Sequence, residues 1–560
     1  MGARLITVLA IIAVAIAAII GFGMFERDAT ADDLAGGPVV LHRGNGAEPL
    51  TLDPHGSAGT WESRILRDLF LGLYTDAIDG TPMLGAAVAH EVSDDLLTHT
   101  LTIREGLVWS DGVPVTAHDF EFALKRIMDP LTAARYASLL YLIENAEEIN
   151  SGDISDLDEL GVVAIDNRTL EIRLNRPAPF MPWLLTHVTT YPVPQHVVEA
   201  HGDDWTRPQN IVSNGPYMLV NWVPNDHISV ERNPLFYDAE NIVIDEVVFY
   251  PTDDQSAALR RFRAGELDLN SGFPSQQLTW LQENMSEETR IFEYIGTSYL
   301  SVNVREAPLN DANIRRALAL AIDRDIIAFD ILKKGQVPAY TLVPPQIPDY
   351  TPPEADFGQA DWDQNRRRME AQRLMREAGY GPDNPLRFTY RYRESVDNRR
   401  IAVAIQGFWQ EIYVDADIVN TEPAVHYQDL EQGNFDVGDA GWIADYPDAE
   451  NYLFLLDSGS GLLNYGAYSN PEYDALLALA ATTADLEARA AILAQAEAII
   501  VDEMPLIPTV YSVSSNLVGP HVVGYEDNVV DIHATRWITI DEARRPVQAS
   551  FVDQIMRWFN

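Results

Sequence analysis

The sequence contains no cysteine among its 560 residues. This absence excludes disulfides, thiol nucleophiles, cysteine-ligated metals and a lipid anchor on an N-terminal cysteine. Lysine is almost as scarce and occurs only at Lys125, Lys333 and Lys334, so a lysine-based mechanism has few candidates. Positive charge is in short supply overall, with 39 basic residues against 84 acidic ones and a formal net charge of -45. Because phosphate binding needs positive charge, we expect no nucleic acid partner.

The common catalytic and metal-binding motifs are also absent. The chain has no G-x-S-x-G, S-x-x-K, H-E-x-x-H or phosphate-binding glycine loop. Its 12 histidines are scattered, and none pair four residues apart on a predicted helix, so we expect no metal site and no cofactor. We predict a protein that is not an enzyme. A hydrolase stays open as an alternative, since catalytic groups need not be neighbours in the sequence.

The N-terminus predicts export. An uncharged apolar run from Leu5 to Phe25 follows Arg4, and Ala29-Thr30-Ala31 has the small-x-small form of a signal-peptidase site. The run is also long enough to cross a bilayer, so residues 1–31 are either a cleaved signal peptide or an uncleaved anchor. Residues 544–560 at the other end form an expected amphipathic extension. Its apolar side would carry Phe551, Ile555, Trp558 and Phe559.

Between the two ends, short alternating strands are interspersed with amphipathic helices. Strands are predicted at 99–103, 168–174, 245–250 and 299–304, and helices at 116–130, 310–323, 365–382 and 485–505. On the helix at 310–323 the apolar face carries Ile314, Leu318, Ala321 and Ile322. The alternation predicts an α/β fold, and 47% apolar residues suffice for two or three lobes.

One short stretch concentrates aromatic and acidic side chains. "GWIADYPDAEN", residues 441–451, follows a strand-like "FDV" and contains no His, Cys, Ser or Lys. Its carboxylates therefore have no neighbouring catalytic partner. An exported, multi-lobed chain that is rich in aromatic residues and carboxylates and lacks catalytic motifs has the profile of a binding protein.

Nine stretches, in this order, are similar to those of a known family. They lie at Arg43–Ser57, Arg67–Thr75, Leu101–Pro130, Asn214–Trp222, Glu231–Asp238, Phe262–Leu269, Ala307–Ile327, Asn434–Leu453 and Met504–Val518. Together they resemble the periplasmic oligopeptide-binding proteins of extracellular solute-binding protein family 5, which serve peptide ABC importers. The similarity runs from about Val39 to Ile540.

The resemblance implies a two-lobed, three-domain periplasmic binding protein of type II-like fold that closes about a hinge. Domain I would comprise residues 32–70, 195–296 and 513–543. Domain II, residues 71–194, would be inserted into it, and domain III would be residues 297–512. The family further implies a peptide ligand held between domains I and III, and partners in a membrane permease and its ATPase subunits.

The resemblance also implies the binding residues. Asp445 matches a carboxylate that pairs with the α-ammonium of the ligand, Gly441 and Ile443 match main-chain pairing positions, and Trp442 matches a pocket wall. Thr60 falls on the facing segment of domain I. Further positions matching the cleft of relatives are Tyr136, Tyr294, Tyr299, Asn303 and Tyr511.

The chain departs from the family where the C-terminal carboxylate of the ligand is bound. Relatives carry basic residues at the positions of Asp439 and Asn398 and near Leu430. Arg399 or Arg400 could substitute if the loop shifts. Otherwise the ligand would be a longer, modified or basic peptide, with Asp439 meeting a cation.

We predict a monomeric periplasmic solute-binding subunit of an ABC importer that captures oligopeptides. Two alternatives keep the fold: a binder of another amine-bearing solute such as an opine, sugar or modified peptide, and a membrane-anchored sensory receptor. The sequence leaves open the length, composition and affinity of the peptide.

Overall fold

The computed structural model describes residues 37–57, 59–305, 307–353 and 362–545. The predicted signal peptide or anchor at 1–31, and the C-terminal extension from residue 546 on, lie outside these ranges. Within them, no helix combines the length and the apolar character needed to cross a membrane.

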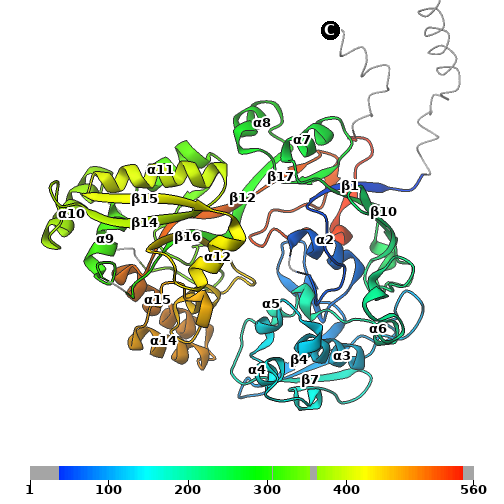
Figure 1. The fold of residues 1–560 in the computed structure, drawn as a ribbon. Helices are drawn as coiled ribbons and strands as arrows, with labels where there is room; N and C mark the ends of the chain where they lie inside the picture. Colours follow the sequence, from blue (N-terminus) through cyan, green and yellow to red (C-terminus); the bar gives the residue numbers. More distant parts are fainter. Residues whose placement is uncertain (1–36, 58, 306, 354–361, 546–560) are drawn as a thin grey trace, which may run out of the picture. The chain divides into compact units, whose positions relative to one another are not determined.

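The largest sheet has eleven strands of mixed direction (Figure 1). Ten of them run in the order β15-β14-β16-β12-β17-β11-β1-β10-β9-β8, and β13 pairs with β17 off this path. The strands are β1 (Val40–Gly46), β8 (Tyr217–Val223), β9 (His227–Arg232), β10 (Glu246–Pro251), β11 (Leu269–Ser271), β12 (Thr289–Val302), β13 (Val337–Pro338), β14 (Leu386–Arg393), β15 (Val414–Thr421), β16 (Val437–Ile443) and β17 (Leu506–Val518).

Two long antiparallel strands, β12 and β17, run through the middle of this sheet. Both cross the boundaries predicted between domains I and III, at residues 296/297 and 512/513. Their register breaks between Glu293 and Thr297, where β-bulge irregularity replaces regular pairing. Bulges bend strands and increase their twist, so this is a natural place for a hinge. The domain boundaries themselves stay a prediction.

Hydrophobic clusters lie on opposite faces of β12 and β16. On one face, Val437 of β16 packs with Trp409 of α11 (Val396–Gln410). On the other face, Ala440 and Ala444 pack with α14 (Pro471–Ala481) and α15 (Leu486–Glu503). The alternation follows from the two-residue period of a strand. Both faces of β16 are thus covered, which fixes its register and the direction of each side chain.

Residues 71–194 contain a separate four-stranded sheet in the order β4-β5-β7-β6. Its strands are β4 (Ala87–Val92), β5 (Thr98–Ile103), β6 (Val162–Ala164) and β7 (Thr169–Arg173). Helix α3 (Ala117–Met128) begins as predicted at Thr116, whose N–H donates to the Asp119 carboxylate at 2.7 Å.

The remaining elements are short strands and connecting helices. They are β2 (Tyr74–Asp76), β3 (Pro82–Leu84), β18 (Val522–Val523), β19 (Thr539–Ile540), α2 (Thr60–Leu69), α4 (Ala146–Ser151), α5 (Met181–Leu184), α6 (Gln195–His201), α7 (Gln255–Arg263), α8 (Leu278–Asn284), α9 (Ala312–Ala321), α10 (Gln364–Glu377), α12 (Pro423–Glu431) and α13 (Glu450–Leu453).

Most predicted elements agree with the structure. The strands β5, β7 and β10 and the helices α9, α10 and α15 lie within the predicted ranges or one or two residues from them. On α9 the predicted face, Ile314, Leu318, Ala321 and Ile322, is buried. The strand predicted at 299–304 is wrong in extent, because it is the end of the 14-residue β12. Gly296 and the polar residues beside it interrupt the apolar alternation from which the strand was predicted.

Candidate functional site

Asp445 follows the end of β16 and lines a cavity of about 310 Å³. Four other residues predicted for the site line the same cavity, although they come from distant parts of the chain. They are Thr60, Tyr136, Tyr294 and Ile443. The structure therefore brings together five of the eleven predicted residues around one space. Residues from all three predicted domains contribute to its wall.

The Asp445 carboxylate has no cationic partner among the described residues. Burial raises its pKa to about 6, and the only opposing influence is a hydrogen bond from the Asn451 side chain. The backbone N–H of Asp445 donates to Asn451 Oδ1 at 3.1 Å, which fixes the residue on its turn. A buried carboxylate without a counter-ion is costly, so the site favours a ligand that supplies positive charge.

Two tyrosines lie within the electrostatic influence of Asp445. Burial, with a contribution from Asp445, raises the pKa of Tyr136. Burial and neighbouring carboxylates raise the pKa of Tyr294 to about 12. Both phenols therefore stay neutral at physiological pH, and each presents an O–H group to the cavity rather than another negative charge.

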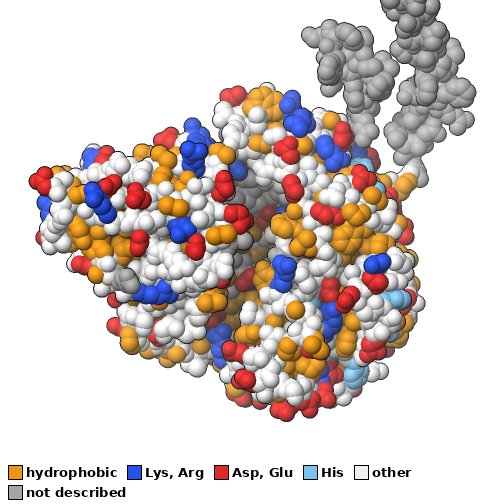
Figure 2. Space-filling view, in the orientation of Figure 1, with side chains coloured by type: hydrophobic (Ala, Val, Ile, Leu, Met, Phe, Trp, Pro, Cys, Tyr) orange, Lys and Arg blue, Asp and Glu red, His pale blue; other side chains and the backbone are white. Residues whose placement is uncertain are grey.

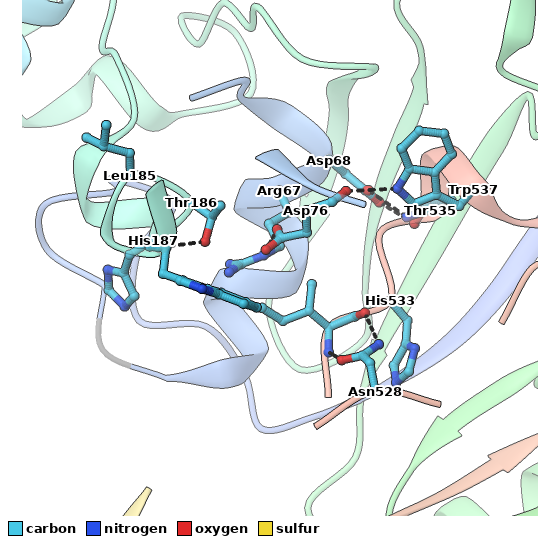
Figure 3. A network of polar contacts seen from close by, with 12 residues as sticks. Arg67, Asp68, Asp76, Leu185, Thr186, His187, Asn528, His533, Thr535 and Trp537 are labelled. Atoms are coloured by element: carbon cyan, nitrogen blue, oxygen red, sulfur yellow. Dashed lines mark hydrogen bonds and ion pairs between the residues drawn. The ribbon is translucent and has the colours of Figure 1, made fainter. Parts of the chain in front are cut away.

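The far wall of the cavity is a polar network that the sequence analysis missed (Figure 3). Arg67 of α2 pairs with Asp76 of β2, with Nε 2.9 Å from Oδ2. His187 Nδ1 accepts from the Thr189 N–H at 3.3 Å, and the His187 ring lies 5.1 Å from that of Tyr136. Burial lowers the pKa of His187 to about 3, so it is a neutral hydrogen-bond donor through Nε2.

One signal for this wall was present in the sequence. Thr60, Arg64 and Arg67 recur at intervals of four and three, which places them on one face of a helix, and all three line the cavity. The residues from 183 to 188 carry no such periodic signal. Asp68 on the same helix accepts from the Thr535 hydroxyl at 2.6 Å and so holds the C-terminal segment, whose residues 530–534 also line the cavity (Figure 3).

Strand β16 offers a free backbone edge beside Asp445. On one side it pairs with β12 along its whole length, from Val437 to Ile443. On the other side it pairs with β14 only at Val437 and Gly438. The Ala444 N–H donates to Ile295 O, so by the alternation of antiparallel pairing the backbone groups of Gly441 and Ile443 point away from β12. They face the edge of β16 that β12 does not cover, and their pairing with a ligand stays a prediction.

Gly441 is not required by the fold. A Cβ at this position would have its nearest contact with Thr297 O at 3.5 Å, an ordinary van der Waals distance. The backbone does not adopt positive φ here either. The space beside Gly441 would therefore admit a Cβ without a clash.

Trp442 lies on the opposite face of β16 and is half-buried. Its Nε1–H donates to Asn451 Oδ1 at 3.0 Å, the same oxygen that accepts from the Asp445 N–H. Its ring packs against Phe454 with centroids 5.5 Å apart. Trp442 therefore positions the turn that carries Asp445, and its role as a pocket wall stays a prediction.

Asp439 and Tyr299 line a different cavity, of about 190 Å³. Asp439 is ion-paired with Arg393 of β14, with Oδ2 3.0 Å from Nε. The cation beside Asp439 is thus a residue of the protein. The sequence analysis missed Arg393 and considered Arg399 and Arg400 instead, neither of which lines this cavity; Arg400 pairs with Asp397 at 3.5 Å.

Asn303 and Tyr511 line neither of these cavities. The Asn303 amide donates to the carbonyl oxygens of Gly433 and Phe435 at 3.1 and 2.9 Å, and so fixes the turn before β16. Tyr511 is buried, with its hydroxyl 2.5 Å from Thr341 Oγ1. In this structure both residues have packing roles, because their polar atoms are taken up by the protein.

No group of three His, Asp or Glu side chains is placed to hold a metal ion in the ranges the structure covers. Acidic side chains are scattered over the face shown in Figure 2, with basic ones between them. The acidic excess is thus spread widely over this face.

Comparisons with known proteins agree with this architecture. The model of the bacterial extracellular solute-binding proteins, family 5, matches residues 81–464. The periplasmic oligopeptide-binding protein OppA of Salmonella typhimurium is 38% identical over 506 residues, covering 89% of this chain and 92% of the relative.

Two solved structures have the same fold. One is the unliganded open form of MppA, a periplasmic murein tripeptide binding protein, with a TM-score of 0.79, 33% identity and coverage of 90% of this chain and 98% of the other. The other is OppA of Haemophilus influenzae in complex with RPPGFSPFR, with a TM-score of 0.76, 35% identity and coverage of 90% and 99%. These matches confirm the predicted α/β fold of the two-lobed periplasmic binding proteins. The chain belongs to the bacterial extracellular solute-binding proteins of family 5.

Proposed function

We propose that the chain is the periplasmic solute-binding subunit of an ABC importer. It captures oligopeptides between its two lobes and delivers them to a membrane permease with its ATPase subunits. The observation that carries this function is the unpaired Asp445 carboxylate at one end of the free β16 edge. The carboxylate can pair with a positive group of a ligand, and the strand edge can form hydrogen bonds with a peptide backbone. The arrangement lies in a cavity to which all three predicted domains contribute.

Binding would proceed by two kinds of contact. The α-ammonium of the peptide pairs with Asp445, which replaces an uncompensated charge by a charge-assisted hydrogen bond. The peptide main chain adds as a strand to the free edge, where Gly441 and Ile443 present their N–H and C=O groups. Neither contact depends on the side chains of the ligand, so peptides of many sequences are accepted. Tyr136 and Tyr294 provide neutral walls.

The names of the relatives support this function. OppA of Salmonella typhimurium is a periplasmic oligopeptide-binding protein, and the MppA structure is that of a murein tripeptide binding protein. We extend the periplasmic location and the peptide ligand to this chain. The predicted domain boundaries belong to the same proposal, with the bulge between Glu293 and Thr297 as the hinge.

We further propose that the protein binds without turnover. The relatives are binding proteins, and Asp445 has the environment of a charge anchor, with a raised pKa and no cationic partner among the described residues. Incubating the purified protein with a defined peptide pool and following it by mass spectrometry tests this directly. New cleavage products that scale with protein concentration would establish the hydrolase alternative.

Substitution of Asp445 tests the anchor. Asp445→Asn keeps the size of the side chain and removes its charge, and it should weaken binding of free-amine peptides by on the order of 3–5 kcal/mol, at least a hundredfold in Kd. Calorimetry with a peptide and its N-acetylated form gives the comparison. The acetylated peptide should bind weakly to both proteins.

Asp415→Asn is the matched control. It removes the same charge from β15, where Asp415 is exposed and pairs with Arg387 at 3.1 Å. Its affinities should equal those of the wild type. Undiminished affinity of Asp445→Asn for the free-amine peptide would contradict the anchor.

A further inference from the structure

The 190 Å³ cavity lies where β14 and β16 separate, at the closed end of the free edge. Its lining comes from β12, β14, β16 and β17, with Asn398 and Ile401 from α11. Asp439 precedes Asp445 by six residues, which corresponds to roughly 20 Å along an extended strand. A short peptide anchored by its amine at Asp445 and running along β16 would place its other end at this cavity.

The Asp439 carboxylate there is fully engaged by the protein. It accepts from the Arg393 backbone N–H at 2.7 Å, from Arg393 Nε at 3.0 Å and from Asn398 Nδ2 at 3.3 Å. The His426 Nε2–H donates to the Asp439 backbone oxygen at 2.7 Å. Because the Asp439 side chain caps the N–H of Arg393, it also marks the point at which β14 stops pairing with β16.

The cluster carries no net charge. Burial lowers the pKa of His426, which keeps its imidazole neutral at physiological pH. The remaining pair consists of one guanidinium and one carboxylate. The Arg393 side chain is 29% exposed and the Asp439 side chain 11%, so the pair is accessible from the cavity. Arg393 also donates to the Tyr427 hydroxyl at 2.8 Å.

We propose that this cavity binds the end of the ligand remote from its amine, and that Asp439 makes it select an uncharged polar group over a free carboxylate. The groups that fit are a terminal amide or an internal peptide group of a longer chain. The inference rests on the proposed function of the β16 edge. Asp439 is then a specificity-determining residue.

The physical reason is competition for Arg393. A ligand carboxylate could pair with the guanidinium only by displacing Asp439, which would leave a buried carboxylate without its main partner. If both stayed, two negative charges would share one positive charge in a partly buried site. An amide escapes both costs, since it can donate to a carboxylate oxygen and accept from the guanidinium.

A charge-removing variant tests the inference. Asp439→Asn retains an oxygen to accept from the Arg393 N–H but leaves the guanidinium without a counter-ion. Tri- to hexapeptides of one sequence would be compared as free acids and as C-terminal amides by calorimetry. In the wild type the amide should bind about tenfold more tightly than the free acid, whereas in Asp439→Asn the free acid should gain about tenfold or more relative to the amide.

Asp429→Asn is the matched control. Asp429 pairs at 2.9 Å with Arg391, which lies on β14 as Arg393 does. The side chains of this pair are exposed to a similar extent as those of Asp439 and Arg393, and Asp429 does not line the cavity. The variant changes net charge by the same amount and should leave the acid-to-amide ratio as in the wild type. Unchanged affinity of the amide peptide in Asp439→Asn would show that the variant is folded.

Two results would overturn the inference alone. One is a wild-type protein that binds the free acids as tightly as the amides or more tightly, and the other is an unchanged acid-to-amide ratio in Asp439→Asn. A wild-type protein that binds none of the peptides in either form would instead contradict the proposed function. The two failures are therefore distinguishable in one set of titrations.

Discussion

At the residue scale, the site depends on one carboxylate, Asp445, that has no cationic partner among the residues the structure describes. Other buried carboxylates nearby have partners: Asp76 has Arg67, Asp439 has Arg393 and Asp448 has Arg489. Asp445 has only the amide of Asn451 and a raised pKa. Because a buried charge without a partner is unfavourable, its retention points to a ligand that completes the pair.

The raised pKa of Asp445 predicts acid-sensitive binding. The anchor binds an ammonium only when deprotonated, and the free-state pKa is about 6. Affinity for free-amine peptides should therefore be full near neutral pH and fall by about tenfold by about pH 5. At alkaline pH it should fall again, since an α-amino group deprotonates near pH 8. Isothermal titration calorimetry across this range provides the measurement.

The histidines and tyrosines of the cavity do not account for such a profile. Burial lowers the pKa of His187 to about 3, and burial also lowers the pKa of His533. The pKa values of Tyr136 and Tyr294 are raised. The residual binding of Asp445→Asn should consequently be flat in the acid range. A wild-type affinity that stays constant down to about pH 5 would exclude Asp445 as the charged anchor.

The sequence predicted individual site residues unevenly, and the reason is physical. Asp445 was identified because its motif is local and continuous. Arg393 was missed because its partner Asp439 lies 46 residues away on a neighbouring strand, and only the pairing of β14 with β16 brings the two together. Asn303 and Tyr511 matched the pattern of the cleft, yet the structure uses their polar atoms for packing contacts.

At the element scale, β16 combines a structural edge with a binding edge. Its pairing with β12 is complete, whereas no described strand pairs with its other side beyond Gly438, and the Asp439 backbone oxygen there accepts from His426 instead. Unpaired strand edges readily accept another chain, and proteins normally cover or charge them. Here the free edge is short and lies next to a cavity, with Ile443 53% exposed at its end. The two functions are separable because they use alternate residues.

Replacing Ile443 by proline tests this separation. Proline removes the N–H that faces the ligand and no hydrogen bond to β12, so it should weaken peptide binding by about 1 kcal/mol and leave the melting temperature nearly unchanged. Ala444→Pro is the control, since it removes the 2.9 Å bond from Ala444 N–H to Ile295 O. That variant should lower the melting temperature in differential scanning calorimetry.

The opposite pattern would contradict the proposed orientation of β16. If Ile443→Pro destabilised the fold as much as Ala444→Pro and bound peptide normally, the N–H of Ile443 in the wild type would be bonded to β12.

Strands and helices were largely predictable from the sequence, because their periodicity is local. The extent of β12 was not, since its first half is held by β17 rather than by its own apolar pattern.

At the scale of the whole molecule, residues after Asp445 contact the segment predicted to be domain II. Phe180 stacks on Tyr446 with ring centroids 4.4 Å apart, and Arg176 pairs with Glu450 at 2.9 Å. Arg489 joins this group through Asp448 at 2.7 Å. The turn that carries Asp445 is thus bounded by β16 on one side and by the predicted domain II on the other, which ties the anchor to predicted domains II and III.

The net charge of -45 predicts how charged peptides reach the site. Acidic side chains are scattered over the face in Figure 2, and a net negative field raises the local concentration of positively charged ligands. At low salt, peptides with added lysines should therefore associate several-fold faster than the same peptides with added glutamates. The difference between the two association rates should shrink above about 0.3 M salt, because screening shortens the range of the field to a few ångströms. Stopped-flow fluorescence of the 11 tryptophans can follow both rates. Dissociation rates should change much less, because the contacts at Asp445 and β16 are short-ranged and partly buried. Equal association rates for lysine and glutamate peptides at low salt would show that the acidic surface has no part in ligand capture.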